Sequence, residues 1–480
     1  MVVLAANISC RGTKYTFAGQ FYGVLGSMLF NVVLVGLFAF AVIIRPTPIW
    51  NPQYVIPIVG MLLGNCTNGI SLTMNNITIA LVEQQREIEL YLSFGATSYE
   101  AVSRLLREAV RSGTTPILNS MAVIGIISIP GMMTGQILGG SPVMEAARYQ
   151  MLIMYLIAVC TFGVILMEVW VIVDVGFDSS HMLRPERFEK APVRLNFGGV
   201  IWAALQSCSF GRTRREGGVR FESTNGNEME PLRNSDVDVK YVAPNGRLEV
   251  QPMKETCGSS LGDALVLNGL TRSLSMEDIT KTRTLFSDVS FTVGSGEISL
   301  VKGPSGCGKS QLLRSIAGLS PLDEGSISLE GLDWNNGFVC KSDWRKSVRY
   351  VTQYKVDIPG TPIDFIRRVA SFKSWQRDPG APTEREILKS TSELIGQWGL
   401  QIDCLGKEWA VLSGGESQRV IVALALASKP RVLLLDESTS ALDLTSKTAV
   451  EHSVYDLAKK NGLKIVWVSH DNDQLERMNV

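Results

Sequence analysis

The sequence lacks several features that mark common classes of protein. Its 46 Lys and Arg residues balance 46 Asp and Glu residues, so bulk charge indicates no nucleic acid or other highly charged partner. Its eight cysteines include no CxxC pair, which argues against a disulfide framework and against a zinc module. The N-terminus lacks the short basic-then-apolar pattern of a signal peptide. Reduced thiols in a cytosolic or intramembrane setting fit these absences.

The apolar residues are concentrated in the first third of the chain, and the remainder has the composition of a soluble protein. A membrane-spanning helix needs about 20 apolar residues. Four segments qualify, at 21–44, 54–82, 116–138 and 151–173. Backbone groups in lipid must bond within their own segment, so these segments are expected to be helices. A buried helix of a soluble protein would explain one such segment, but four in succession favour a multi-pass membrane domain in contact with lipid.

Basic residues occur in alternate loops, which predicts the orientation of these helices. The two loops at 45–53 and 139–150 hold only Arg45 and Arg148. The other flanking regions hold Arg11, Lys14, Arg86, Arg104, Arg107, Arg111, Arg184, Arg187, Lys190 and Arg194. We therefore expect those regions and both termini on the cytosolic side.

The second apolar segment carries a polar stripe. Its members follow one another at spacings of 3, 3, 4 and 3 residues: Asn65, Asn68, Ser71, Asn75 and Thr78. That spacing places them on one helical face, which should point into the bundle. Two interpretations remain, a substrate path or interhelical hydrogen bonds beside a close-packing Gly60xxxGly64 pair. Glu168, inside the fourth segment, is a second candidate for the path because a carboxyl group at that depth is costly.

The third apolar segment contains "SIPGMMTGQ". Pro130 removes a backbone donor and Gly131 adds backbone freedom, so a kink or break is expected. Broken helices frame many transport sites, and a packing kink with Gly131xxxGly135 is the alternative.

After about residue 190 the apolar pattern ends. Residues 191–261 are mixed in charge and rich in Gly, Asn and Pro, which predicts a flexible linker, with a hairpin in "DVKYVAPNGRLEV" as an alternative for part of it. From 262 to 480, short apolar runs such as "SLVKG" and "RVLLLDE" alternate with helix-like segments. This rhythm is typical of a parallel sheet with crossover helices.

The motif "GPSGCGKS" follows one of these apolar runs and precedes a helix-like segment, as a phosphate-binding P-loop requires. Its backbone N–H groups and the positive end of the helix would surround phosphate oxygens. Lys309 would pair with the β- and γ-phosphates, and Ser310 would hold Mg²⁺. The expected ATP-binding residues are Gly303, Pro304, Ser305, Gly306, Cys307, Gly308, Lys309 and Ser310.

Further motifs downstream fit the same chemistry. The strand-like "RVLLLDE" ends in Asp436, which suits Mg²⁺, and Glu437, which suits the activation of an attacking water. With "LSGGESQR", "YVTQ", "SALD" and "WVSHD", the region 262–480 resembles the ATPase domain of ABC transporters. The resemblance assigns the signature to Leu412, Ser413, Gly414, Gly415 and Glu416.

The ABC resemblance also implies a mechanism. Two ATPase domains meet head to tail, and the signature of one closes over ATP on the P-loop of the other. Glu437 is then the general base, His470 contacts the γ-phosphate, and Gln353 joins Ser310 and Asp436 around Mg²⁺.

Two positions near the P-loop depart from the common pattern or invite a second interpretation. The family often places an aromatic residue upstream of the P-loop to stack on adenine, but no aromatic residue occurs from 262 to 285. Phe286 is expected in the core, so base selectivity should be weak. Cys307 could make the loop sensitive to oxidation, or could be a small tolerated residue.

The charged stretch "EQQREIELYLSFGAT", residues 83–97, lies between two apolar segments on the expected cytosolic side. We expect it to dock on the ATPase domain beside Gln353 and to transmit ATP closure to the membrane helices. A solvated connecting helix is the alternative.

The membrane third is similar to a known permease family as well. "QYVIPIVGMLLGN", "EQQREIELYLSFGATSYEA" and "SIPGMMTGQILGGSPVMEAARYQ" resemble the bacterial iron-export and plant aluminium-tolerance permeases (UPF0014-like). Permeases of this family carry further helices before the region corresponding to Tyr15, which implies N-terminal truncation or loss of helices here.

The sequence thus predicts a multi-domain protein, an α-helical membrane bundle joined to an α/β P-loop ABC ATPase domain. The domains are a permease at 1–190, a linker at 191–261 and the ATPase at 262–480. The predicted function is a homodimeric half-transporter that hydrolyses ATP with Mg²⁺ and exports a metal ion such as iron. The alternatives are transport of a nucleotide sugar or organic anion, and a membrane-tethered ATPase with mechanical or regulatory work.

Overall fold

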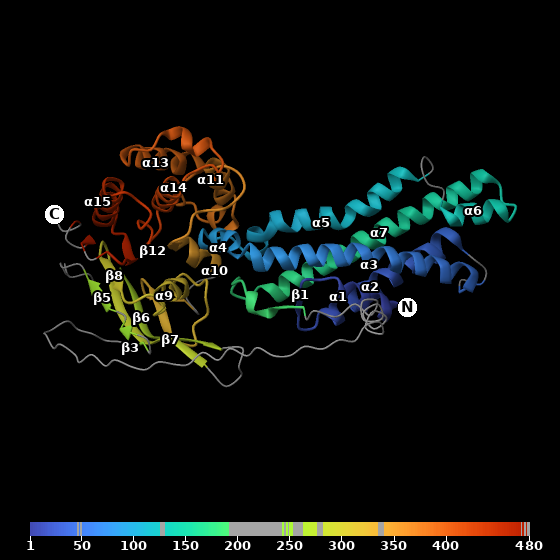
Figure 1. The fold of residues 1–480 in the computed structure, drawn as a ribbon, viewed down its shortest axis with the longest axis horizontal. Helices are drawn as coiled ribbons and strands as arrows, with labels where there is room; N and C mark the ends of the chain where they lie inside the picture. The colour runs from blue at the N-terminus through green and yellow to red at the C-terminus, as the bar shows by residue number, and fades with distance from the viewer. Residues whose placement is uncertain are drawn as a thin grey trace, which may run out of the picture.

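The computed structural model describes residues 1–45, 48, 50–124, 130–191, 242–243, 246–247, 249–252, 263–275, 282–334, 340–471, 473–474 and 477. In this part of the chain, a helical bundle and an α/β domain lie end to end along the long axis of the molecule (Figure 1). The N-terminus lies on the bundle. The predicted combination of a helical bundle with an α/β P-loop domain is confirmed.

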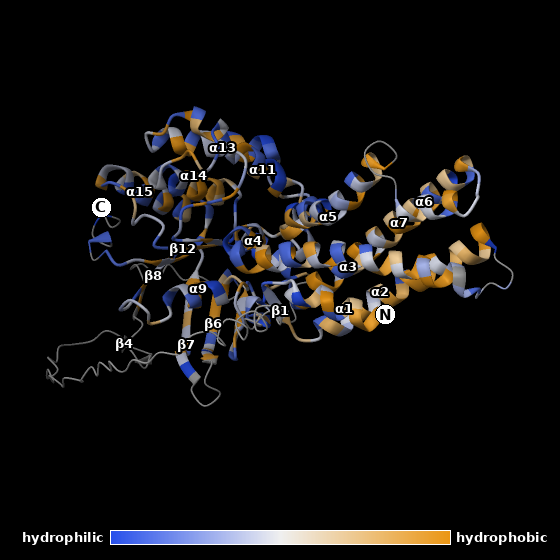
Figure 2. Ribbon diagram, turned by 45° about the vertical axis from the view of Figure 1, so that its right-hand side comes forward, coloured by the Kyte–Doolittle hydropathy of each residue, from blue (hydrophilic) through white to orange (hydrophobic). Residues whose placement is uncertain are grey.

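The bundle contains six of the described helices, namely α1 (Val2–Arg11), α2 (Gln20–Phe38) with its π-helical extension (Ala39–Ile44), α3 (Pro52–Glu83), α5 (Ser98–Val123), α6 (Gly131–Leu138) and α7 (Val143–Gly176). Three stretches are long and apolar enough to cross a membrane, Gln20–Ile44, Tyr54–Glu83 and Val143–Gly176. Apolar residues dominate α2 and α7, whereas α4, next to the α/β domain, is mostly hydrophilic (Figure 2). Large apolar side chains such as Phe38, Tyr155 and Trp170 are exposed on these helices, as contact with lipid would require.

The predicted third span, 116–138, is not one continuous helix. α5 ends at Val123 and α6 begins at Gly131, directly after Pro130. The break expected at Pro130 is therefore confirmed, but an unbroken third span is not present. Even so, α2, α3, α5 and α7 run alternately away from and toward the α/β domain (Figure 1).

Three helices approach closely at two glycines that the sequence analysis did not single out. A Cβ at Gly69 of α3 would lie 2.7 Å from Thr161 Cγ2 of α7, and one at Gly113 of α5 would lie 3.1 Å from the Gly69 carbonyl oxygen. Small residues let membrane helices pack backbone to backbone, and these two positions do so. The predicted Gly60xxxGly64 pair has no comparable neighbours, since a Cβ at Gly64 would meet nothing within 4 Å.

The bundle end next to the α/β domain brings together segments that were all predicted to be cytosolic. β1 (Tyr15–Phe17) pairs antiparallel with β2 (Phe188–Lys190), so the segments before α2 and after α7 meet. Lys14 Nζ lies 2.5 Å from Glu83 Oε1 at the end of α3. The alternation of basic loops thus correctly predicted which segments share one end of the bundle.

The α/β domain contains two larger sheets. The five-stranded sheet has the order β11 (Val348–Val351), β12 (Val432–Asp436), β13 (Lys464–Val468), β8 (Ile298–Lys302) and β5 (Glu249–Pro252), and all of its strands except β5 are parallel. The antiparallel four-stranded sheet has the order β10 (Leu332–Asp333), β9 (Glu324–Leu329), β6 (Ala264–Ser275) and β7 (Thr282–Gly294). The helices are α9 (Lys309–Ile316), α10 (Lys341–Ser347), α11 (Pro362–Ala370), α12 (Lys373–Gln376), α13 (Glu384–Gln397), α14 (Gly414–Ala427) and α15 (Leu444–Asn461). Every residue of β12 and β13 is buried, as their apolar runs predicted.

Most of the predicted linker, 191–261, lies outside the described residues. Within it, β3 (Val242–Ala243) and β4 (Gly246–Arg247) form the hairpin that was the alternative for this stretch. β5 adds to the edge of the parallel sheet, where Val250 is opposite Val301 of β8. The folded α/β domain therefore includes residues upstream of the predicted boundary at 262.

Candidate nucleotide site and its contact with the membrane helices

The P-loop connects β8 to α9, as its motif requires. Gly306 and Gly308 have φ angles of 81° and 98°, in the left-handed region that strains any residue with a Cβ. Gly308 also precedes the first turn of α9, where a Cβ would lie 3.0 Å from the Leu285 carbonyl oxygen. The loop thus presents backbone N–H groups at the positive end of a helix, which suits phosphate.

Lys309 is almost fully buried, and its ammonium donates hydrogen bonds to the carbonyl oxygens of Gly303 (2.7 Å) and Pro304 (3.0 Å). These bonds hold the positive charge inside the loop, where phosphate oxygens would compete for it. Pro304 and Ser305 are exposed at the rim. Cys307 is buried, which favours the interpretation of a small tolerated residue over an oxidation-sensitive one.

Asp436, at the end of β12, is buried and accepts two hydrogen bonds. Ser310 Oγ donates to its Oδ1 at 3.0 Å, and the Tyr350 hydroxyl donates to its Oδ2 at 2.9 Å. Burial raises the pKa of Asp436, and the two hydroxyl donors oppose that rise. A serine hydroxyl beside a carboxylate supplies the hard oxygen ligands that Mg²⁺ prefers. Tyr350 was missed by the sequence analysis, although it begins the "YVTQ" motif.

Glu437 lies between the other two candidate catalytic residues. Gln353 Nε2 donates to Glu437 Oε2 at 2.9 Å, and His470 Nε2 lies 3.0 Å from Glu437 Oε1. The backbone of Glu437 has φ 46°, and its N–H donates to the Val468 carbonyl oxygen of β13. Three residues predicted from separate motifs therefore meet at the carboxyl ends of neighbouring parallel strands, which is where such sheets bind ligands.

A capping box holds the signature turn at the start of α14. Ser413 caps α14, and its Oγ accepts a hydrogen bond from the Glu416 N–H, while Glu416 Oε2 accepts one from the Ser413 N–H at 2.8 Å. Leu412 is buried below the turn, whereas Ser413 and Gly414 are exposed. A Cβ at Gly415 would lie 3.4 Å from the Ala441 carbonyl oxygen, so the turn packs on the "SALD" segment. The N-terminus of α14 is thus a second exposed helix end suited to an anion.

Phe286 is completely buried, as expected, and does not offer a face to a nucleotide base. The neighbourhood of the P-loop instead contains Arg283, whose Nη2 donates to the Gly306 carbonyl oxygen at 3.4 Å. Leu274, opposite Arg283 in the β6–β7 pair, is exposed.

The candidate residues of the membrane path are not brought together at one place. Asn75 Oδ1 accepts a hydrogen bond from the Lys14 N–H at 2.9 Å, so it holds the segment before β1. Glu168 is completely buried and accepts a hydrogen bond from Ser27 Oγ of α2 at 3.2 Å. Asn68 is exposed, Ser71 is half-buried, and Asn65 lines a cavity between α3, α5 and α7.

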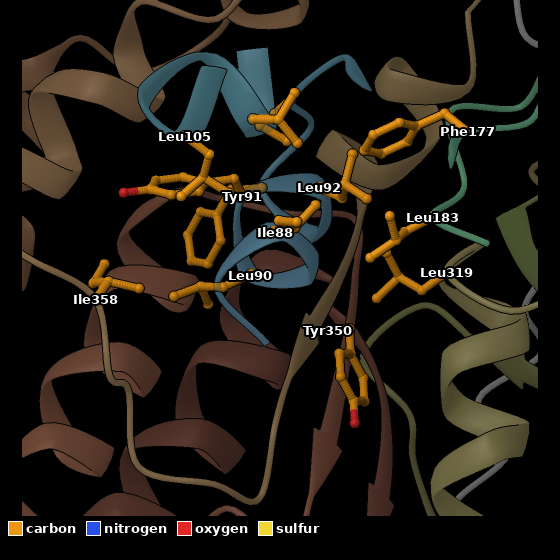
Figure 3. Close-up of a cluster of buried hydrophobic side chains, with 14 of the residues drawn as sticks. Ile88, Leu90, Tyr91, Leu92, Leu105, Phe177, Leu183, Leu319, Tyr350 and Ile358 are labelled. Carbon is orange, nitrogen blue, oxygen red and sulfur yellow. The ribbon is translucent and has the colours of Figure 1, made fainter. Parts of the chain in front are cut away.

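The charged stretch between the second and third apolar segments forms α4 (Gln85–Ser93), which lies against the ATPase domain. Ile88, Leu90, Tyr91 and Leu92 of α4 join a buried apolar cluster with Leu319, Tyr350 and Ile358 of the ATPase domain (Figure 3). Full burial of an aliphatic side chain of this size is favourable by roughly 1.5–3 kcal/mol relative to exposure to water, and part of that burial comes from this contact. The predicted docking is confirmed, and a solvated connecting helix is excluded.

Polar contacts hold the turn after α4 as well. Trp375 Nε1 donates to the Phe94 carbonyl oxygen at 2.8 Å, and Ser374 Oγ donates to the Gly95 carbonyl oxygen at 2.7 Å. Arg349 donates to the Ser93 carbonyl oxygen at 2.9 Å and lies 4.2 Å from the centroid of the Phe94 ring. Burial lowers the pKa of Arg349 to about 9, which leaves the guanidinium charged at neutral pH.

α4 also reaches the nucleotide site directly. Glu89 forms an ion pair with Arg314, which lies one helical turn after Ser310 on α9. The Arg86 guanidinium lies 3.9 Å from the centroid of the Tyr354 ring, next to Gln353, as predicted. A cavity of about 270 Å³ between α4 and α9 is bordered by Glu89, Arg314, Ser310 and Asp436. The side chains of Glu89 and Arg314, together with this cavity, therefore lie between α4 and the candidate Mg²⁺ ligands.

Comparison with known proteins agrees with both halves of this arrangement. Residues 1–175 match UPF0014, an uncharacterised protein family, and residues 286–440 match the ABC transporter family. The chain is 43% identical over 120 residues to a UPF0014 membrane protein of Synechocystis, which covers 25% of this chain and 46% of that protein. It is 31% identical over 191 residues to the probable iron export ATP-binding protein FetA of Escherichia coli, covering 40% of this chain and 80% of that protein.

Two further relatives extend the comparison. The chain is 34% identical over 202 residues to the spermidine/putrescine import ATP-binding protein PotA of Haemophilus ducreyi, covering 42% of this chain and 52% of that protein. A dimeric ATP-binding cassette bound to ADP and Pi aligns with a TM-score of 0.39 at 24% identity, over 44% of this chain and 90% of that one. The chain spans about half the length of the Synechocystis protein and of PotA. The chain belongs to the ABC transporter ATPases, and it carries a UPF0014 membrane domain on the same polypeptide.

Proposed function

We propose that the chain is a half-transporter that acts as a homodimer and uses ATP hydrolysis to export a metal, with iron as the first candidate. The observation that carries this proposal is the docking of α4, which joins the bundle to the nucleotide site within one polypeptide. The name of one relative, the probable iron export ATP-binding protein FetA, supports iron as cargo. Transport of a nucleotide sugar or another organic anion is the alternative cargo.

We propose the following roles for the residues of the nucleotide site, and their contacts support these roles. The P-loop N–H groups and Lys309 bind the phosphates of ATP. Ser310, Asp436 and Gln353 would hold Mg²⁺, which when bound neutralises phosphate charge. Glu437 orients and deprotonates the attacking water, and its contacts with Gln353 and His470 fix its carboxylate. His470 is then positioned to contact the γ-phosphate.

The exposed signature turn supports a dimer. Ser413 and Gly414 face solvent at the N-terminus of α14, where a phosphate of a nucleotide on a second chain can bind. Closure of the two chains over ATP would move α9, and the Glu89–Arg314 ion pair would transmit that movement to α4. Gln353 provides a parallel route, because its neighbour Tyr354 contacts Arg86.

The test is the ATPase rate of the full chain in lipid vesicles, measured with a panel of divalent and trivalent metals and nucleotide sugars. Glu437→Gln is the blank, because it keeps the shape of the side chain and removes the base. Stimulation by a metal supports export of that metal, and stimulation by nucleotide sugars alone replaces metal as the cargo. A robust rate that no solute changes would refute transport and favour a membrane-tethered ATPase with mechanical or regulatory work.

A further inference from the structure

α5 lies along one edge of the bundle, with α3 and α7 beneath it and α2 on the opposite edge (Figures 1 and 2). Every fourth residue of α5 from Leu105 to Ile117 is buried, on the side where the helix packs on α3 and α7. The opposite side also repeats every fourth residue, and its members are exposed: Arg107, Arg111, Thr115 and Asn119. These four residues form the outer face of α5.

The outer face reaches the depth of the apolar membrane spans. A Cβ at Gly113 of α5 would lie 3.2 Å from Ile165 Cδ1 of α7, so these two residues are at one level. Asn31 of α2 donates to Met167 Sδ of α7 at 3.0 Å and is at nearly the same level. Arg111 is two residues before Gly113, a rise of about 3 Å. Arg111 is thus level with the central part of α2 and α7.

At this level α2 and α7 expose large apolar side chains, which are unfavourable in water and suit contact with lipid. The exposed residues next to Asn31 and Ile165 are Phe30, Val33 and Leu34 of α2 and Phe162 and Leu166 of α7. The two helices therefore indicate that hydrocarbon surrounds the bundle at the depth of Arg111.

Exposed aromatic residues indicate where this lipid-facing surface ends on the side of the ATPase domain. Tyr22 of α2 is exposed nine residues before Asn31, about 14 Å away, and Trp170 of α7 is exposed five residues after Ile165, about 8 Å away. Tyr and Trp are enriched at membrane–water interfaces. Arg111 is therefore on the hydrocarbon side of this boundary.

The outer face is too polar to lie against lipid at this depth. Thr115 and Asn119 lie about 6 and 12 Å deeper than Arg111, and their short side chains cannot extend to the headgroups as an arginine can. Polar and charged side chains inside a membrane face protein or water rather than hydrocarbon. The outer face of α5 therefore requires a polar neighbour.

One arginine near the outer face has its partners within the bundle. Arg104 pairs with Glu87 at 2.6 Å and with Glu108 at 2.7 Å. Among the residues that the structure describes, no acidic side chain pairs with Arg107 or Arg111. The proposed homodimer offers a neighbour from outside the chain, because its two ATPase domains must lie on one side of the membrane with the bundles side by side.

A second copy of the chain fits the outer face by charge. Glu108 is exposed and lies between Arg107 and Arg111 along the helix. A two-fold axis that runs across the membrane brings two outer faces together at equal depth, so each Glu108 comes opposite the arginines of the other copy. Thr115 and Asn119 can exchange hydrogen bonds in the same contact. The outer face is thus self-complementary, as an interface between identical chains requires.

We propose that two copies of this chain meet in the membrane through the outer face of α5. The inference rests on the homodimer of the proposed function and specifies its contact in the membrane. α5 begins directly after the turn at Phe94 and Gly95 that Trp375 and Ser374 hold on the ATPase domain. Movement of either ATPase domain would therefore reach this contact through α5.

The test is oxidative cross-linking, with copper phenanthroline, of the full chain in lipid vesicles. Thr115→Cys and Asn119→Cys each place a thiol on the outer face without changing its charge, so the test stands if one of them fails to fold. Val159→Cys places a thiol on the exposed side of α7 at the depth of Asn119 and is the matched control. The parent chain gives the background from its own cysteines.

We expect a disulfide-linked dimer in at least one of the two α5 variants, and only the parent background in Val159→Cys. A second measurement follows the dissociation constant of the dimer as labelled chains are diluted with lipid. Arg111→Leu should raise this constant at least tenfold, whereas a lipid-facing α5 would tolerate the change. Arg148→Leu, at the exposed outer end of α7, should behave as the parent chain.

The outcomes separate the α5 contact from the homodimer itself. A chain that dimerises without cross-linking at Thr115→Cys or Asn119→Cys, and whose dimer Arg111→Leu does not weaken, overturns the outer face of α5 and leaves the homodimer standing. Cross-linking of Val159→Cys to the same extent as the α5 variants also overturns the outer face. A chain that stays monomeric as Glu437→Gln with MgATP refutes the homodimer.

Discussion

At the scale of single residues, Tyr350 is a positioning residue of the nucleotide site. Its hydroxyl donates to Asp436, and that bond favours the charged carboxylate against the effect of burial. Tyr350→Phe removes the donor without changing the shape of the ring.

We expect Tyr350→Phe to raise the pKa of Asp436, so that Mg²⁺-dependent ATPase activity is lost at a higher pH as the medium is acidified. The measurement is the pH profile of kcat/KM for MgATP from pH 5 to 8, in parent and variant. A purely structural role would lower activity by the same factor at every pH. If kcat/KM falls at the same acidic pH in the parent chain and in Tyr350→Phe, the positioning role is contradicted.

His181 is expected to make the stability of the contact between the domains depend on pH. Its Nδ1 lies 3.1 Å from Ser98 Oγ at the N-terminus of α5. Burial and then the positive charge of Arg345 lower the pKa of His181, while Glu100 opposes them. Between the lowered pKa and about 6.5 the unfolded chain binds more protons than the folded one, so stability falls as pH falls through this window.

We therefore expect the melting temperature of the parent chain to drop more steeply below pH 6.5 than that of His181→Gln. His452→Gln, on the exposed face of α15, is the matched control and should follow the parent chain. Parallel curves for the parent chain and His181→Gln would show that His181 does not carry this dependence.

At the scale of elements, α4 connects the bundle to the ATPase domain. The Glu89–Arg314 ion pair joins α4 to α9, and both side chains are largely buried. Reversing one charge places two like charges together in a poorly hydrated contact, which costs far more than the loss of a surface pair.

We expect Glu89→Arg to lower solute-stimulated ATPase activity about tenfold, and the double variant Glu89→Arg/Arg314→Glu to recover most of it. The comparison is stimulated against basal rate in lipid vesicles. The exposed pair Lys389–Glu393 on α13, reversed in the same way, should change neither rate. Failure of the double variant to recover would argue against transmission through this pair.

The elements also show which parts of this protein are predictable from sequence. The P-loop, the β12 carboxylates and the α14 cap depend on neighbours within a few residues, so motif spacing was sufficient to locate them. The role of Tyr350 was not predicted from the sequence because its partner Asp436 is on another strand. Their pairing depends on the order of strands in the sheet. β5 was not predicted from the sequence because the apolar pattern of a four-residue edge strand is too short to distinguish it from a linker.

Three of the four predicted membrane spans are found in the described residues, but the contacts between the membrane helices were not predictable. Helical periodicity placed Asn65 and Asn75 on one face. It could not show that Asn75 accepts a hydrogen bond from the Lys14 backbone, whereas Asn65 lines a pocket. Pro130 correctly predicted the break before α6. The close approach of Gly69 and Gly113 depends on how three helices cross, which no single segment encodes.

At the scale of the whole molecule, the proposed dimer makes each ATP site from two chains. Lys309→Ala removes one half of a site, and Ser413→Arg blocks the other half, so each variant alone should be inactive. A mixed dimer contains one site with both intact halves. We expect ATPase activity to reappear when the two variants are reconstituted together, at roughly a quarter of the parent rate after random mixing. A mixture that stays inactive would contradict composite sites.

The central claim is that ATP hydrolysis in this chain moves a solute through its own helical bundle. The most direct test is ATP-driven accumulation of iron, supplied as Fe²⁺, in sealed vesicles with the ATPase domain outside. We expect accumulation that needs ATP, is lost in Glu437→Gln and falls about tenfold in Glu89→Arg. Robust ATP hydrolysis by the same vesicles with no accumulation of iron would contradict transport of iron by this chain.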